Sequence, residues 1–186
     1  KNDLLRSREL LESISGQKIV GYRAPSFSVT DDVVDVLADL GFRYDSSYNP
    51  FKLNARYGTI SKKIDQVNGI LKIENGLYEI PLSQTRILGQ TVPISGGAYF
   101  RLIPTLIFKG LLKRYLKHNN VYTFYLHPWE FEPEQPRVKS ISFNYRFRHY
   151  TGLNTTASKL QILIEMLRQN GCVFKSMRNY IEHTDR

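Results

Sequence analysis

The sequence predicts an α/β fold built around a parallel sheet. Three short apolar or aromatic stretches, at residues 18–22, 42–45 and 121–126, are typical of buried strands. A helical pattern over 31–40 separates the first two, and the order strand, helix, strand is characteristic of βαβ units with parallel strands. Each stretch ends on residues that can carry chemistry, and active sites in α/β folds collect at the carboxyl ends of strands.

The size and composition indicate one folded domain. The chain has 186 residues, 41% of them hydrophobic, and it shows no linker between domains, so we expect a single domain over 1–186. No apolar run is long enough for a membrane-spanning helix. A helix is predicted over 3–14, directly after Lys1, and we therefore expect the chain to be part of a longer polypeptide.

The excess of basic residues indicates which kinds of partner the chain could bind. The sequence contains 26 Lys and Arg against 17 Asp and Glu, a net charge of +9, which could attract uronate polymers, sugar nucleotides or nucleic acid. No basic run exceeds two residues, and the aromatic residues lie mostly in apolar strands, so we expect no nucleic-acid partner. The single Cys172 excludes an internal disulfide and favours a reducing, cytoplasmic compartment, although any export signal would lie upstream of Lys1.

Periodicity and stop signals predict the remaining elements. Thr30 is expected to cap the helix over 31–40. Gly89 divides the stretch 86–94 into two strands joined by a hairpin turn. Further elements are a helix starting near 156 and a short strand at 172–174, whereas 49–75 and 130–150 are predicted to be irregular. A helix over 104–117 is expected to pack inward through Leu106, Ile107, Leu111, Leu112 and Tyr115.

Side chains able to perform chemistry lie at the ends of the predicted strands. They are Arg23, Pro25, Asp45, Ser47 and His127. An arginine can orient a carboxylate or lower its pKa, and a histidine can serve as a general acid or base. Packing at a strand end is the alternative reading for each of them. Gly96 and Gly97 could let a ligand approach the backbone closely, and a plain turn explains them equally well.

Five stretches, in this order, resemble the polysaccharide deacetylases, the carbohydrate esterases built around the chitooligosaccharide deacetylase domain. Residues 21–27, GYRAPSF, are similar to the third motif of that family, and 41–47, GFRYDSS, resemble the fourth. Residues 125–130, YLHPWE, resemble the fifth. Residues 93–101 and 146–150, PISGGAYFR and RFRHY, resemble signatures of the subgroup found with exopolysaccharide and surface-polysaccharide loci.

The resemblance implies a distorted (β/α)7 barrel, of which this chain would supply the C-terminal strands and helices. It also implies an amide hydrolase that removes acetyl from an N-acetylated sugar of a polysaccharide or its precursor. Arg23 would position the catalytic base, His127 would be the general acid that protonates the departing amine, and Leu126 would help to line the acetyl pocket. The N-acetylated polysaccharide or oligosaccharide would also contact Pro25, Asp45, Ser47, Gly96, Gly97, Tyr99 and Trp129.

The implied cofactor is a divalent metal, usually zinc, held by one Asp and a closely spaced His pair. The sequence offers no His pair at that spacing, and Thr30-Asp31-Asp32 is interpreted as a helix cap. We therefore expect the metal and base motifs upstream of Lys1, assign no metal ligand to this chain, and expect the chain alone to be inactive. The alternative function is a non-catalytic carbohydrate-binding or scaffold module that retains the cleft without the metal.

Overall fold

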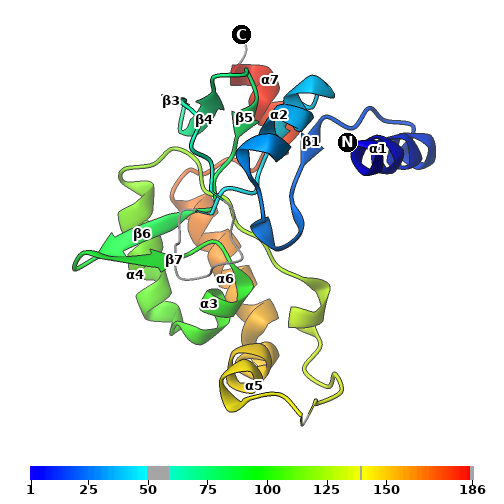
Figure 1. Ribbon diagram of the computed structural model, residues 1–186. Coiled ribbons are helices and arrows are strands. Elements are labelled where there is room, and N and C mark those ends of the chain that lie inside the picture. Colours follow the sequence, from blue (N-terminus) through cyan, green and yellow to red (C-terminus); the bar gives the residue numbers. More distant parts are fainter. Residues whose placement is uncertain (50–58, 139, 185–186) are drawn as a thin grey trace. The chain divides into compact units, whose positions relative to one another are not determined.

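Two groups of packed elements make up the chain in the computed structural model, which describes residues 1–49, 59–138 and 140–184 (Figure 1). The first unit comprises Lys1–Leu82 and Lys175–Arg186, and the second comprises Ser83–Phe174. The sequence predicts one domain, whereas the structure divides the chain into two compact units, each with its own hydrophobic core. None of the helices in the described ranges combines the length and the apolar character needed to cross a bilayer.

A five-stranded mixed sheet forms the first unit, in the order β1-β2-β5-β4-β3. The strands are β1 (Gly21–Tyr22), β2 (Tyr44–Asp45), β3 (Ile64–Val67), β4 (Ile70–Ile73) and β5 (Tyr78–Glu79). The pair β1–β2 is parallel, as predicted, and β2–β5 is parallel as well, whereas β3 and β4 add an antiparallel hairpin at one edge. The parallel register sets Tyr22 beside Asp45 and Asp45 beside Glu79, so the two acidic residues occupy neighbouring strands.

The hairpin β3–β4 corrects the prediction of an irregular segment over 49–75. Its turn residues Asn68 and Gly69 have φ values of 50° and 84°, the left-handed conformations that a tight hairpin turn requires. The Asn-Gly dipeptide was therefore the available signal. Residues 50–58 of the same segment lie outside the described residues.

Three helices accompany this sheet: α1 (Asn2–Ser15), α2 (Asp31–Asp39) and α7 (Met177–Thr184). The predicted cap of α2 is confirmed, because the Thr30 hydroxyl accepts the Val33 N–H at 3.5 Å. The α7 helix was not predicted, although its Ile181 is fully buried. The core of the unit consists of residues from α2 and the segments around it: Val29, Val34, Leu37, Phe42, Ile73 and Leu77.

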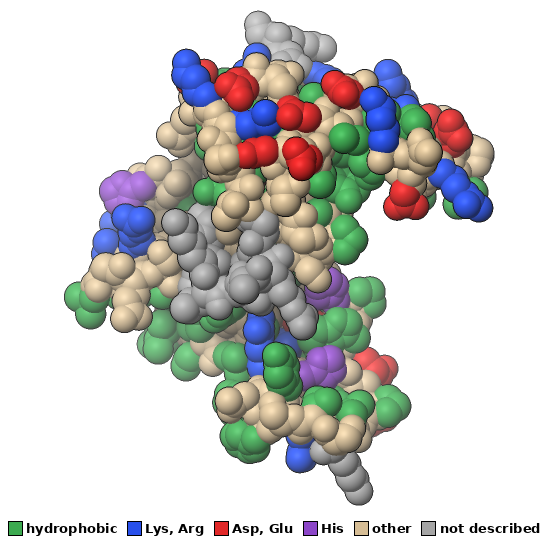
Figure 2. Space-filling model, in the orientation of Figure 1, with side chains coloured by type: hydrophobic (Ala, Val, Ile, Leu, Met, Phe, Trp, Pro, Cys, Tyr) green, Lys and Arg blue, Asp and Glu red, His purple; other side chains and the backbone are tan. Residues whose placement is uncertain are grey.

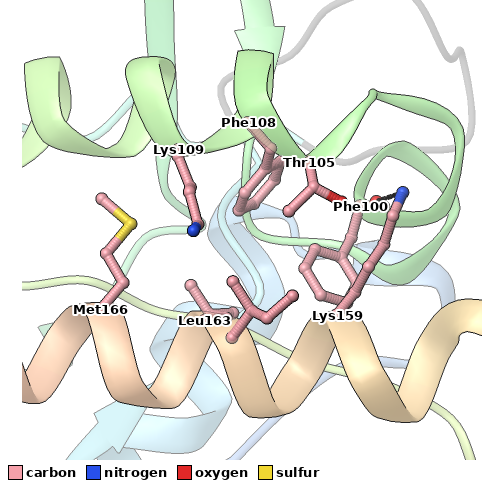
Figure 3. Close-up of a pocket in the computed structure, with 8 residues that line it drawn as sticks. Phe100, Thr105, Phe108, Lys109, Lys159, Leu163 and Met166 are labelled. Carbon is pink, nitrogen blue, oxygen red and sulfur yellow. Dashed lines mark hydrogen bonds between the residues drawn. The ribbon is translucent and has the colours of Figure 1, made fainter.

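The second unit is mainly helical. Its hairpin pairs β6 (Gln84–Ile87) with β7 (Gln90–Pro93), as predicted, through a turn at Leu88 and Gly89. The α-helices are α3 (Gly97–Leu102), α4 (Thr105–Leu116), α5 (Phe143–Tyr150) and α6 (Thr156–Gln169). The core lies between α4 and α6, where Phe108 points toward Leu163 and Met166 (Figure 3).

Several predictions for this unit are wrong. Residues 121–126 are extended, but they pair only through one isolated bridge between Tyr125 and Gly96, because the chain enters α3 directly after Gly96. Within the predicted irregular segment 130–150, α5 forms a helix, and 172–174 do not form a strand. Leu106 and Ile107 of α4 are 83% and 55% exposed, since α4 turns Phe108 inward instead.

The fold class is confirmed as mixed α/β, whereas the barrel is not seen. The described residues form an open five-stranded sheet with edges at β1 and β3, and a separate two-stranded hairpin. Neither arrangement closes on itself. The predicted site residues lie at the strand ends of the first unit, and in the second unit around His127 and at the start of α3.

Candidate functional site

Arg23 is fixed by the end of strand β2. Its Nε donates to the Ser46 carbonyl oxygen at 2.7 Å, and its Nη2 donates to the Ser46 hydroxyl at 2.7 Å. The same hydroxyl donates to the carbonyl of Ile80, which follows β5 directly, at 2.8 Å. The guanidinium is therefore oriented by two adjacent parallel strands, as expected for a residue whose direction matters.

Asp45 and Ser47 are buried and bind each other. The Ser47 hydroxyl donates to Asp45 Oδ1 at 2.7 Å, and the Ser47 N–H donates to Asp45 Oδ2 at 3.2 Å. The Ala24 N–H donates to the Ser47 hydroxyl at 2.7 Å, which ties the segment after Arg23 to the end of β2. The two side chains therefore hold the backbone of the segment after Arg23 in place through these hydrogen bonds.

The turn after Arg23 is strained. A short 3-10 helix, η1 (Pro25–Phe27), contains Ser26 and Phe27 at φ values of 53° and 57°, where residues with side chains are uncommon. The Arg23 guanidinium lies 5.7 Å from the centre of the Phe27 ring. Consecutive left-handed residues of this kind are found where the surrounding structure imposes a local geometry, and they cluster at functional sites.

Sequence reasoning missed a second buried carboxyl group, Glu79, beside Asp45. Its Oε1 accepts the Tyr48 N–H at 2.9 Å, and its Oε2 has no N–H or O–H partner among the described residues. Burial raises the pKa of Glu79 well above its usual range, and the charge of Asp45 raises it further. Burial also raises the pKa of Asp45, against hydrogen bonds from Glu79 and Ser47 that lower it. A proton on Glu79 shared with Asp45 satisfies both groups.

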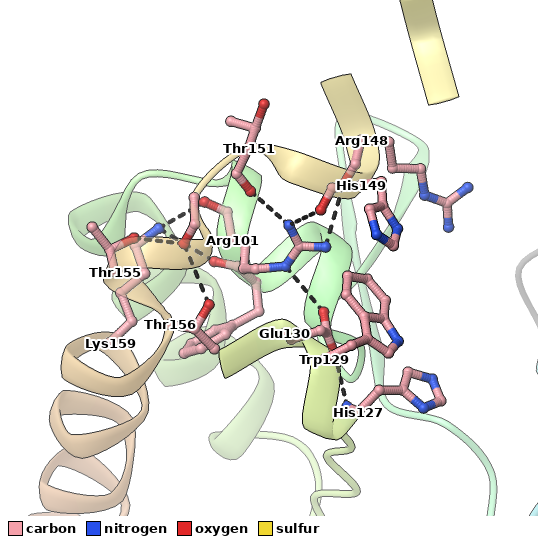
Figure 4. A network of polar contacts seen from close by, with 12 residues as sticks. Arg101, His127, Trp129, Glu130, Arg148, His149, Thr151, Thr155, Thr156 and Lys159 are labelled. Atoms are coloured by element: carbon pink, nitrogen blue, oxygen red, sulfur yellow. Dashed lines mark hydrogen bonds and ion pairs between the residues drawn. The ribbon is translucent and has the colours of Figure 1, made fainter. Parts of the chain in front are cut away.

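A separate cluster surrounds His127 in the second unit (Figure 4). His127 precedes a 3-10 helix, η2 (Pro128–Phe131), and its backbone N–H donates to Glu130 Oε2 at 2.9 Å. Glu130 Oε1 accepts from Arg101 Nε at 3.0 Å, and the two side chains are 2% and 0% exposed. The backbone of His127 is thus fixed by a buried ion pair, while its side chain is exposed.

The two adjacent glycines make room for this arrangement. A Cβ atom at Gly97 would lie 1.9 Å from Glu130 Oε1, and one at Gly96 would lie 2.5 Å from the Tyr125 hydroxyl. The close approach that the sequence predicts at these positions is therefore made by the protein's own side chains. Both glycines support the His127 segment, since any side chain there would displace Glu130 or Tyr125.

Arg101 also holds helix α5. Its Nη1 donates to the carbonyl oxygens of His149 at 3.0 Å and Thr151 at 2.6 Å, and its Nη2 donates to that of Arg148 at 3.3 Å. These carbonyls lie at the C-terminal end of α5, where backbone acceptors lack partners within the helix. One guanidinium thus connects η2 with α5.

Aromatic rings form a stack across the same connection. The Trp129 and His149 rings lie 4.3 Å apart at 13°, and the His127 and Trp129 rings lie 6.1 Å apart at 11° (Figure 4). Burial, together with the charge of Arg101, lowers the pKa of His149, against the charge of Glu130, which raises it. Its Nε2 lies 2.8 Å from Gln135 Oε1, which indicates that the proton sits on Nε2. Trp129 therefore has a ring face covered by His149.

The structure distributes the predicted site residues between the two units. Arg23, Pro25, Asp45 and Ser47 belong to the first, where hydrogen bonds connect all but Pro25 with Glu79 nearby. The second contains the other six: Gly96, Gly97, Tyr99, Leu126, His127 and Trp129. Gly97, His127 and Trp129 lie against Glu130 or Arg101, and Leu126 packs on the core. Gly96 lies against Tyr125, and Arg148 lies over the Tyr99 ring. Sequence reasoning missed Arg101, Glu130 and His149, although a charged residue within the apolar stretch 99–103 was a signal for Arg101.

The described residues do not fit the metal that the resemblance implies. They contain no group of three or more His, Cys, Asp or Glu side chains able to hold a metal ion. Two hollows on the second unit lie elsewhere, between α4 and α6: an apolar cavity of about 10 Å³ (Figure 3) and an open groove of about 570 Å³. None of the predicted site residues lines either of them.

Comparison with known proteins identifies a family. The family model described as "Domain of unknown function (DUF3473)" matches residues 46–182, and the chain belongs to that family. No curated protein and no solved structure matches the chain. The match includes the whole second unit and, in the first unit, the chain from the residue after β2 through β5 and most of α7. The geometry around His127 is therefore that of a DUF3473 domain, whereas Arg23 and Asp45 lie before the match.

The shared proton of the Asp45–Glu79 pair predicts a pH dependence of stability. Because the folded protein keeps a proton on Glu79 where the unfolded chain has released it, the free energy of unfolding should fall as pH rises above the ordinary carboxyl pKa. The slope for one proton is at most about 1.4 kcal/mol per pH unit. In Glu79→Gln, whose amide mimics the protonated acid, denaturant unfolding measured across pH 4–8 should give a flatter profile. An unchanged slope would show that Glu79 is ionised.

Removing the Arg101 guanidinium should release α5. Arg101→Met leaves Glu130 buried without its partner, and breaking such a pair costs about 3–5 kcal/mol. Amide hydrogen exchange should accelerate over 143–151 more than over α6, because the helix loses three hydrogen bonds at its end. The control is Arg114→Met on the exposed face of α4. If the amides of α5 exchange no faster in Arg101→Met, Arg101 does not hold this helix in place.

Proposed function

We propose that the chain is the C-terminal part of a metal-dependent hydrolase that removes N-acetyl groups from an N-acetylated sugar of a polysaccharide or its precursor. DUF3473 domains are associated with the C-terminal part of polysaccharide deacetylases, which supports the resemblance seen in the sequence. The structural observation that carries the proposal is the placement of His127. Its imidazole is exposed, while its backbone is held by the buried carboxylate of Glu130.

The proposed role of His127 is that of general acid. Hydrolysis adds water to the amide carbon, and the bond from carbon to nitrogen then breaks to give acetate and an amine. The nitrogen needs a proton in order to leave, and an imidazolium beside it can supply one. A catalytic acid must reach the substrate while its own position is fixed. His127 combines both properties, and the half-buried Leu126 before it would line the pocket for the acetyl methyl.

The proposed role of Arg23 is to orient the carboxylate base, which would come from a part of the protein outside this chain. Its guanidinium is already directed by two bonds to Ser46, so little conformational freedom would be lost on pairing. Asp45 and Ser47 would act indirectly, by holding the backbone after Arg23. Together with those further elements, the strands and helices described here would complete the (β/α)7 barrel.

The implied divalent metal, zinc in most such enzymes, would likewise be held by residues outside this chain, because the described residues do not fit it. When bound, such an ion polarises the amide carbonyl and lowers the pKa of its water. The contribution of this chain is the proton donor and the arginine.

A second candidate is a carbohydrate-binding module without catalysis. The exposed aromatic side chains of the second unit and the absence of a metal-ligand set from the described residues favour it. The two functions differ in one observable. A binding module retains an N-acetylated oligosaccharide without releasing acetate, whereas the hydrolase releases one acetate for each amine formed.

The general-acid role predicts a substrate-dependent effect of His127→Ala in the protein that contains this chain. Turnover of an N-acetylated oligosaccharide should fall about 10²–10⁴-fold, and the alkaline limb of the pH–rate profile should disappear. An activated acetate ester should be largely spared, because its departing oxygen hardly needs a proton. Acetate release and ester hydrolysis are measured on the same preparations, and His118→Ala, an exposed histidine beyond α4, serves as control.

Equal losses on amide and ester would contradict the general-acid role, and so would loss of bound metal from the variant. A lowered melting temperature together with a uniform loss would instead show that His127 supports the structure of η2.

A further inference from the structure

The surface of α5 has no role in the proposed reaction, yet a buried charged side chain, Arg101, holds this helix in place. None of its residues is buried, only His149 and Tyr150 are half-buried, and a helix of eight residues with so little packing is marginal by itself. The buried Arg101 guanidinium holds it through three carbonyl oxygens. Phe143, Tyr145 and Phe147 are 76%, 67% and 52% exposed. Exposed aromatic side chains gathered in this way mark an interaction surface.

The charge around α5 has one sign. The sequence has no Asp or Glu between Glu134 and Glu165, whereas Arg137, Arg146 and Arg148 fall in that interval. Within the described ranges, none of these three arginines takes part in an ion pair. Hydrophobic side chains lie on the visible surface over α5 in Figure 2. The surface therefore joins apolar rings with positive charge that is not paired with any carboxylate in the part of the chain that the structure describes.

Two of these arginines are held by aromatic rings. Arg148 lies 5.9 Å from the centre of the Tyr99 ring, and Arg137 lies 4.8 Å from that of Tyr150. Tyr150 is itself fixed, since its hydroxyl accepts the Val138 N–H at 2.9 Å. Stacking engages the face of a guanidinium, and its N–H donors lie in the plane, where they match a carboxylate bidentately.

We propose that the α5 surface, formed by Arg137, Phe143, Tyr145, Arg146, Phe147 and Arg148, binds an acidic polysaccharide through the carboxylates of its sugars. The apolar faces of sugar rings pack on aromatic rings, and the carboxylates pair with the guanidinium groups. The choice of a polysaccharide rests on the proposed function. The α5 surface is continuous with the proposed active site, because His149 of α5 stacks on Trp129, whose ring in turn lies beside His127. A polysaccharide bound at His127 could therefore extend over α5.

A lipid surface fits α5 less well. At 100° per residue, Phe143 and Phe147 lie on one side of the helix and Tyr145 lies on the other, so the aromatic residues do not form a single apolar face. A helix that lies in a membrane interface separates an apolar face from a charged one. A polymer that wraps around an exposed helix can use both sides.

The test compares two oligosaccharides of equal length in the full-length protein that contains this chain. Hyaluronan oligosaccharide alternates N-acetylglucosamine with glucuronate, and chitooligosaccharide carries the same N-acetylated sugar without the carboxylates. Calorimetry should show tighter binding of the hyaluronan oligosaccharide. Arg146→Gln/Arg148→Gln should lower that affinity at least about tenfold and abolish most of the preference, since it removes two charge-assisted contacts.

The matched control is Lys113→Gln/Arg114→Gln, which removes the same charge from exposed positions on α4 and should leave the preference intact. Equal affinity for the two oligosaccharides, or equal losses in the two double variants, would overturn the proposal. So would stronger arginine-dependent binding to phosphatidylserine vesicles or to single-stranded oligothymidine. Acetate release from the neutral chitooligosaccharide is measured separately, so failure of the α5 surface is distinguishable from failure of the proposed hydrolase.

Discussion

The buried ion pair between Arg101 and Glu130 is the interaction on which the geometry of the second unit depends. Such a pair adds little net stability over well-packed apolar residues, because both charges lose their hydration. Its value lies in the hydrogen bonds that it makes. Glu130 fixes the His127 backbone, and Arg101 fixes the end of α5. The pair therefore sets the position of an exposed imidazole and of an exposed helix together, which packing alone could not do.

In the first unit, buried carboxyl groups also hold the backbone of a candidate site residue, but they form an acidic pair instead of an ion pair. Asp45 and Glu79 lie on adjacent parallel strands, and burial raises the pKa of both carboxyl groups. The Ser47 hydroxyl donates to Asp45 and accepts the N–H of Ala24, the residue after Arg23. In each unit, a residue that the proposed reaction uses is held by buried polar groups: Ser46 holds the Arg23 guanidinium, and Glu130 holds the His127 backbone. This arrangement fixes the direction of the Arg23 guanidinium and the position of the His127 backbone, at the cost of burying polar groups that each need a partner.

Local signals made part of the fold predictable. The Thr30 cap, the β6–β7 hairpin and the parallel strands β1 and β2 follow from turn, cap and periodicity rules that act over a few residues. The segment 121–126 could not be predicted correctly, because its pairing depends on where the chain goes after Gly96. The α5 helix could not be predicted either, because it is held by the guanidinium of Arg101, which is more than 40 residues away in the sequence. Arg23 and His127 were visible as strand-end residues, whereas Arg101, Glu130 and Glu79 become significant only through burial, which a sequence does not display.

Acetate release tests the central claim most directly. The 186-residue chain and the longer protein that we propose contains it are each incubated with a chitooligosaccharide and added zinc, and acetate is quantified beside newly formed amine. The account predicts equimolar acetate and amine from the longer protein and none from the 186-residue chain, since the described residues hold no metal-ligand set. Binding of the oligosaccharide by the longer protein without acetate release would contradict the hydrolase. Release by the isolated chain would show that the chemistry described here is incomplete.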